Sequence, residues 1–281
     1  MLQAVVALGL ASLGTLCAAP ALTIERMAMH QYEDGPILEA SYEFLPGETA
    51  HFSCRLSGYQ IDKTNEEQQR VKLNWNVEVT DPAGVPLDKP KSGRIEAQVL
   101  PEDKNWLPKF LTQFMIPPFA QSGNYRVSVR VKDELSGAEV HGDLTFRVRG
   151  HDVEPSDTLV IRNFRFLRSE EDSTPMRQPL YHPGGMLWAK FDAVGYKLGE
   201  NNRFSVAYGL AVEDSAGRQL FAQPEAAAES HESFYPQSYV PGALSLSLDK
   251  NVAPGAYTLV VTVHDKLGDQ AWEERRPFQV E

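Results

Sequence analysis

Apolar and polar residues alternate with a period of two along much of the chain. In residues 123–133, Tyr125, Val127, Val129 and Val131 alternate with charged or hydroxyl side chains. This period is typical of a β-strand with one buried and one solvated face. The same alternation recurs at residues 72–79, 204–212, 244–249 and 257–264. Helical spacing is nearly absent, and we expect only one helical turn within 106–114 and another in the alanine run of 224–230.

One strand pattern occurs twice. The stretch SGNYRVSVRVKDELSG begins at Ser122, and PGAYTLVVTVHDKLG begins at Pro254, 132 residues later. Earlier blocks also recur in the same order with small changes of spacing. Residues 81–84 (DPAG) match 214–217 (DSAG), and the pairs Pro-Gly and Gly-Tyr recur at a spacing of 137. Small changes of spacing are typical of loop insertions in a duplicated unit.

The repeat predicts an all-β protein made of two tandem immunoglobulin-like antiparallel β-sandwich domains after a signal peptide. We assign residues 1–21 to the signal peptide, 22–150 to the first domain, 151–157 to a linker and 158–281 to the second domain. Short alternating segments separated by Gly, Pro, Asn and Asp turns indicate about seven strands in each domain.

On these motifs the chain resembles exported bacterial proteins with tandem immunoglobulin-like or fibronectin-like β-sandwiches. In that class, a P/S-G-x-Y strand of alternating valines ending in Asp commonly forms the penultimate strand, and a strand ending F-x-V closes the domain. Here the closing strands carry Phe146 and Val148, and Phe278 and Val280. The resemblance implies an architecture and names no ligand, because this fold supports many functions.

The first 21 residues contain no charged side chain, and residues 4–16 are an apolar run followed by small residues. This pattern is typical of a secretory signal, and it predicts a periplasmic or secreted protein. Two alternatives remain open: the segment stays as an anchor, or Cys17 is acylated as in a lipoprotein. No other run approaches the roughly 20 apolar residues of a membrane span.

Charge and cysteine content narrow the choice of partners. The formal net charge of −11 disfavours nucleic acid and anionic lipid, which bind clustered Lys and Arg. Cys54 is the only cysteine after the signal segment, so no intrachain disulfide is available. At the spacing of 137, Cys54 matches Phe191. A position that is aromatic in the other copy is expected in the core, where a free cysteine behaves as a small hydrophobe.

The sequence offers little for catalysis or metal binding. It contains no G-x-S-x-G, no phosphate-binding glycine loop and no His or Cys spacing suited to zinc or copper. We expect no cofactor, with calcium as the ion to consider, since Asp152, Glu154 and Asp157 lie together in the linker. Carboxylates that converge only in the fold leave a hydrolase open as an alternative.

Aromatic residues in loops that differ between the two copies are the candidate binding residues. They are Trp106, Phe234, Tyr235 and Tyr239. Variable loops on a rigid sandwich commonly carry recognition, and exposed aromatic rings contact glycans or proteins. The alternative is that these rings cover the open ends of the sandwiches.

These observations predict a non-enzymatic binding or spacer module of the cell envelope that recognises a protein or polysaccharide partner through loops or strand edges. A structural subunit of a surface or secretion assembly, pairing through edge strands, is the first alternative. The second is the carboxylate-dependent hydrolase. The sequence leaves the oligomeric state open.

Overall fold

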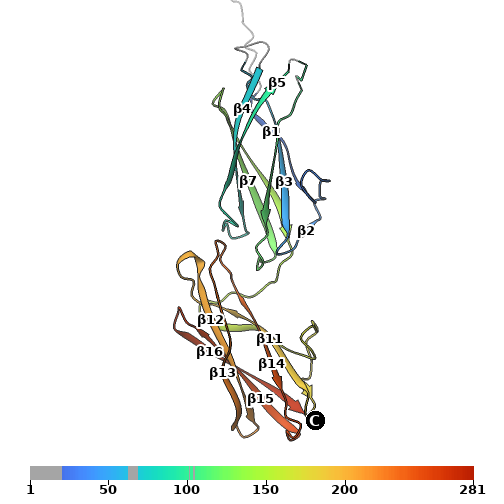
Figure 1. The fold of residues 1–281 in the computed structure, drawn as a ribbon, viewed down its shortest axis with the longest axis vertical. Coiled ribbons are helices and arrows are strands. Elements are labelled where there is room, and N and C mark those ends of the chain that lie inside the picture. Colours follow the sequence, from blue (N-terminus) through green and yellow to red (C-terminus); the bar gives the residue numbers. More distant parts are fainter. Residues whose placement is uncertain (1–20, 63–68, 101, 104) are drawn as a thin grey trace, which may run out of the picture.

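A computed structural model describes residues 21–62, 69–100, 102–103 and 105–281. The predicted signal peptide lies outside the described residues except for Ala21, and so does Cys17. Figure 1 shows the two halves of the chain stacked end to end along the long axis of the molecule. No helix in the described part of the chain is long and apolar enough to span a membrane.

The first half of the described chain folds into two sheets. Its strands are β1 (Thr23–His30), β2 (Glu43–Phe44), β3 (Thr49–Ser57), β4 (Gln69–Thr80), β5 (Lys91–Val99), β6 (Lys109–Met115), β7 (Gly123–Asp133) and β8 (Glu139–Val148). One sheet has the order β1-β3-β6, and the other has the order β2-β8-β7-β4-β5. All pairings are antiparallel except that of β2 with β8.

The second half repeats this arrangement strand by strand. Its strands are β9 (Val160–Leu167), β10 (Leu180–Tyr181), β11 (Met186–Val194), β12 (Phe204–Asp214), β13 (Gln219–His231), β14 (Val240–Ser247), β15 (Gly255–Asp265) and β16 (Gln270–Val280). The sheets are β14-β11-β9 and β10-β16-β15-β12-β13. A short 3-10 helix, η1 (Glu200–Asn202), precedes β12.

The predicted class, an all-β protein of tandem antiparallel sandwiches, is confirmed, and so is the resemblance to immunoglobulin-like architecture. Each half has eight strands rather than about seven, because β2 and β10 have two residues each and show no alternation. Both predicted helical turns are wrong: residues 109–115 form β6, and the alanine run lies within β13. Pairing with β12 overrides the helix propensity of alanine.

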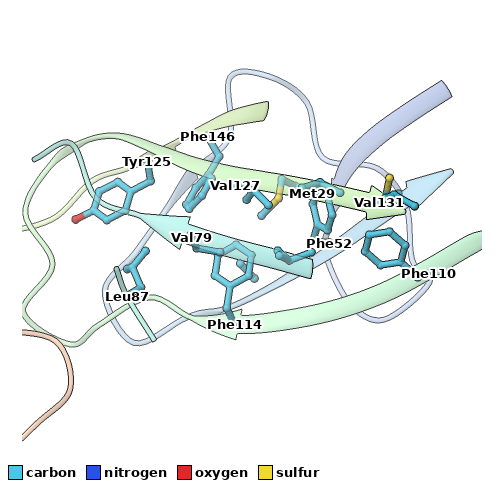
Figure 2. Packing of buried hydrophobic residues seen from close by; sticks show 14 of the residues in the cluster. Met29, Phe52, Val79, Leu87, Phe110, Phe114, Tyr125, Val127, Val131 and Phe146 are labelled. Atoms are coloured by element: carbon cyan, nitrogen blue, oxygen red, sulfur yellow. The ribbon is translucent and has the colours of Figure 1, made fainter. Parts of the chain in front are cut away.

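Each half buries its own core between its two sheets. In the first half, Phe52, Phe114 and Phe146 point into the space between the strands (Figure 2), and each is at most 5% exposed. The corresponding core of the second half includes Phe204 and Phe278. With one cysteine in the described part of the chain, Cys54, apolar burial is the main source of stability.

The repeated Gly-x-Tyr motif has a structural explanation. Tyr125 is fully buried, and its hydroxyl donates a hydrogen bond to the carbonyl of Gln121 at 2.9 Å. The hydroxyl of Tyr257 donates the equivalent hydrogen bond to the carbonyl of Ala253, four residues earlier, at 2.7 Å. This link resembles the tyrosine corner of immunoglobulin domains. Gly123 and Gly255 share a φ of 155°, a conformation that favours glycine.

At one cross-strand pair, the large and the small residue lie on opposite strands in the two cores. In the first half, the fully buried Cys54 of β3 faces Phe110 of β6. In the second half, Phe191 of β11 faces Gly242 of β14, where a Cβ atom would lie 2.2 Å from the ring of Phe191. One aromatic ring therefore fills the same space from opposite strands. The predicted core position of Cys54 is confirmed.

Candidate binding site

Two of the four predicted loop aromatics lie at the junction of the two halves. The hydroxyl of Tyr235 donates a hydrogen bond to Oδ2 of Asp81, which belongs to the first half, at 2.9 Å. Burial raises the pKa of Tyr235. Tyr239 is only 7% exposed and makes T-shaped contacts with Phe119 at 5.5 Å and with His151 at 5.1 Å between ring centroids. These two rings connect the halves.

The other two predicted aromatics lie apart from this junction contact. Trp106 packs partly buried against the first core, in T-shaped contact with Tyr59, whose hydroxyl donates to the Trp106 carbonyl at 2.7 Å. Its ring is therefore partly used in packing against the first core. Phe234 is 48% exposed, and its carbonyl accepts a hydrogen bond from Asn202 at 2.6 Å.

The linker is fixed by apolar and polar contacts. Val153 packs with Val160, Val194 and Tyr239 in a small cluster of its own. Nε2 of His151 lies 2.8 Å from Oδ2 of Asp192, whose side chain is 3% exposed.

The same oxygen of Asp192 accepts a hydrogen bond from the amide of Asn163 at 2.8 Å. Asn163 has a φ of 51° and lies where the register of β9 against β11 shifts. Such a bulge redirects side chains. Asp192 thus connects the linker to the irregular part of β9.

The predicted calcium-binding acids are not gathered into a site. Asp152 accepts a hydrogen bond from the backbone N–H of Ser122 at 3.1 Å, and Glu154 forms an ion pair with Arg162 at 3.4 Å. Asp157 is exposed. Within the described ranges, no group of three or more His, Cys, Asp or Glu side chains could hold a metal ion.

A groove of about 670 Å³ opens beside this linker in the second half. Its walls come from β9, from the segment that leads into β10, from β16 and from the linker. The lining residues include His151, Phe164, Arg165, Phe166, Met176 and Arg276. Sequence reasoning identified none of them as binding residues.

Two arginines line the groove, Arg165 and Arg276. The guanidinium of Arg276 lies 5.3 Å from the ring centroid of Phe164, and it forms an ion pair with Glu274 at 2.8 Å. Arg165 donates a hydrogen bond to the carbonyl of Asn163 at 3.0 Å. Among the described acids, none lies within ion-pair distance of Arg165. The guanidinium of Arg165 is therefore available to pair with an anionic group of a ligand.

The first half has a smaller groove at the equivalent position. It holds about 210 Å³ and is lined by Met27, Met29, Leu38 and Leu144, among others. Met27 and Met29 match Phe164 and Phe166 at the spacing of 137.

The closing strands of the two halves differ at the position that lines these grooves, Leu144 in the first half and Arg276 in the second. At the spacing of 132, β8 carries Val140, Gly142 and Leu144 where β16 carries Trp272, Glu274 and Arg276. In β8 these positions pack against the first core or lie close to β1. The first half therefore serves as an internal reference: two of these three positions, Gly142 and Leu144, are uncharged there and correspond to the charged Glu274 and Arg276 in the second half. Aligning the two closing strands in the sequence would have revealed this change.

The deeply buried carboxylates have structural partners. Asp133 is fully buried and accepts hydrogen bonds from the backbone N–H groups of Gln60 at 2.7 Å and Leu135 at 2.9 Å. Asp265, the counterpart of Asp133, accepts hydrogen bonds from the backbone N–H groups of Lys197 at 2.7 Å and Leu267 at 3.0 Å. These bonds explain the repeated Asp-x-Leu motif, for which turn propensity accounts only in part.

No family model and no curated protein matches the chain. Among solved structures, it is similar to the C-terminal domain of the Streptococcus agalactiae antigen I/II polypeptide BspA, with 9% identity, 90% of this chain and 99% of that chain covered, and a TM-score of 0.29. It is also similar to the C-terminal domain of the Streptococcus pyogenes antigen I/II-family protein AspA, with 8% identity, coverage of 94% and 99%, and a TM-score of 0.30. TM-scores of this size do not establish a shared fold, so the fold assignment depends on the strands and sheets themselves.

Proposed function

We propose that the protein is an exported, non-enzymatic binding module of the cell envelope that recognises a protein or glycan partner at the groove of the second domain. The observation that carries this proposal is the difference between the two grooves. Where the first domain has the apolar Leu144, the second has Arg276, and the groove is about 670 Å³ instead of about 210 Å³.

The junction supports the same role. His151 lines the groove and also contacts Asp192 and Tyr239, so the groove is built on a braced part of the molecule. A rigid support holds a recognition surface in its binding geometry and lowers the entropy cost of association. The apolar, uncharged start of the sequence motivates the exported part of the proposal, in the periplasm or outside the cell.

The test is capture of partners from an envelope extract by the full-length mature protein. Arg276→Leu gives the groove the residue of the first domain. Arg275→Leu is the matched control, because this neighbour is paired with Glu213 and Glu273 and does not line the groove. We expect a partner that the wild type and Arg275→Leu retain and that Arg276→Leu loses. Equal capture by all three proteins would refute a role of the groove.

A structural subunit that pairs through edge strands is the second candidate, and β13 favours it. This strand of 13 residues ends the five-stranded sheet, and all of its residues except Ala226 and Ala227 are exposed. Leu220 and Phe221 are 49% and 42% exposed. Against this candidate, Pro224 lies opposite Gly209 in a register shift, a feature that protects edges against pairing.

Light scattering after size exclusion separates the two candidates. An assembly subunit forms oligomers that Phe221→Lys disrupts, whereas a binding module stays at the mass of one chain when no partner is present.

A further inference from the structure

The strongest unassigned feature is the chemistry of the groove in the second domain, and the following inference rests on the function proposed above. Its arginines are Arg165 and Arg276, of which Arg276 is already paired with Glu274 at 2.8 Å, and Asp152 is the acid among its described lining residues. Asp152 already accepts a hydrogen bond from Ser122. In a chain with a formal net charge of −11, Arg165 is a groove cation without an ion-pair partner among the described acids, and it is complementary to a negatively charged ligand.

The rest of the lining distinguishes between anionic ligands. Sugars bind to bare aromatic faces and to several polar side chains that read their hydroxyl groups. Here the guanidinium of Arg276 covers the ring of Phe164, and the amide of Asn163 is already bonded to Asp192. Phe166 is buried. These features disfavour a polysaccharide.

Apolar side chains complete the wall of the groove. Pro175, Met176, Pro179 and Pro277 line it together with the two phenylalanines. Prolines and a methionine form a surface suited to apolar side chains, and methionine adapts to their shape. A ligand with carboxylates and apolar groups in alternation fits this lining.

The strands at the groove lie at or next to sheet edges that are partly bonded: the carbonyl of Phe166 accepts a hydrogen bond from the backbone N–H of Met176 at 2.9 Å, and the N–H of Gln279 donates to the carbonyl of Pro179 at 2.9 Å. β9 ends the three-stranded sheet. Beyond β16, among the described strands, lies only the two-residue β10, which pairs with Gln279 and Val280. Backbone groups on an unpaired edge bind an extended chain.

We infer that the groove binds an extended acidic peptide segment of a partner protein. Its carboxylates lie on Arg165 and Arg276, and its apolar side chains lie against Met176 and the prolines. Because Arg276 is exposed and Arg165 is half-buried, each carboxylate paired with one of these arginines should change affinity by about two- to fivefold relative to its amide.

The test uses the full-length mature protein and fluorescence polarisation at low salt. The probes are three labelled octapeptides of alternating Glu and Val, Gln and Val, or Lys and Val, with tetragalacturonate as an acidic sugar competitor. We expect the Glu peptide to bind at least about fourfold tighter than the Gln peptide, and this preference to weaken with added salt. Arg165→Gln and Arg276→Leu should remove the preference, while Arg275→Leu should keep it.

Other outcomes overturn the inference. Equal affinity for all three peptides, or loss of the preference in Arg275→Leu, would show that the groove arginines do not select an acidic peptide. Binding of tetragalacturonate without binding of the Glu peptide would assign the groove to acidic glycans. If envelope capture depends on Arg276 but no peptide binds, the ligand class is wrong and the proposed function stands. If capture does not depend on Arg276 either, both fail.

Discussion

Replacing Cys54 by Phe and Phe110 by Gly would give the first domain the packing of the second, in which Phe191 faces Gly242. Each replacement alone breaks the match of volumes at this pair. Phe110→Gly removes a ring that is 5% exposed and stacks on Trp75 at 4.4 Å. Cys54→Phe adds a second ring at a fully buried position.

The magnitudes follow from these contacts. Loss of a buried phenylalanine costs about 3–5 kcal/mol, and glycine in a strand adds about 0.5–1 kcal/mol. Overpacking by Cys54→Phe costs about 1–3 kcal/mol. If the two sites were independent, the double variant would lose about 7 kcal/mol. Because the new ring fills the space left by Phe110, we expect the double variant to lose about 3 kcal/mol less than this sum.

Native-state hydrogen exchange followed by mass spectrometry measures this coupling in the intact chain, because it reports opening free energies segment by segment. Peptides from β3 and β6 report on the altered pair, and peptides from β11 and β14 serve as the internal reference. A double variant that loses as much as the sum of the single variants would refute the compensation of volumes.

Three further predictions concern single groups. Burial raises the pKa of the Cys54 thiol to about 12, so Ellman's reagent at pH 8 should leave the folded protein unlabelled and react fully in urea; labelling of the native protein within minutes would contradict the burial. Tyr235→Phe removes the hydrogen bond to Asp81 and should weaken the junction by about 0.5–1.5 kcal/mol, seen as faster hydrogen exchange in residues 232–239, and unchanged exchange would assign that contact no role. Burial also raises the pKa of Tyr181 to about 12, above the ordinary value of 10.0, so the folded state holds this proton more tightly and stability should fall as pH rises from about 10 to 12. Urea midpoints that do not change over this range would contradict that linkage, and Tyr181→Phe should reduce the slope.

Alternation and duplication were enough to predict the strands with a clear inside and outside, such as β7 and β15. They failed where a strand carries no alternation. In β13 nearly every side chain is exposed, so no apolar face marks it, and its alanines favour a helix in isolation. Only the hydrogen-bonded neighbour β12 decides the conformation of this segment.

The candidate site was harder to predict because its parts meet only in space. Tyr235 and Tyr239 were predicted as binding residues because their loops differ between the copies, but their contacts with Asp81 and Phe119 depend on how the domains meet. The groove joins residues 151–179 to residues 276–277. Its one visible signal was the substitution of Leu144 by Arg276 between the copies. The linker acids are close together in sequence, but in the fold Asp152 is bonded to Ser122 and Glu154 is paired with Arg162.

The reciprocal sizes at Cys54 and Phe110, and at Phe191 and Gly242, have a consequence for folding. Tandem copies of one domain risk exchanging equivalent strands as they emerge from the same chain. If β14 replaced β6 beside β3, Cys54 would face Gly242 and leave a void. If β6 replaced β14 beside β11, two phenylalanine rings would compete for one space. The residue sizes in each copy therefore fit only the strands of that copy, and we expect a hybrid sandwich to be less stable in either combination.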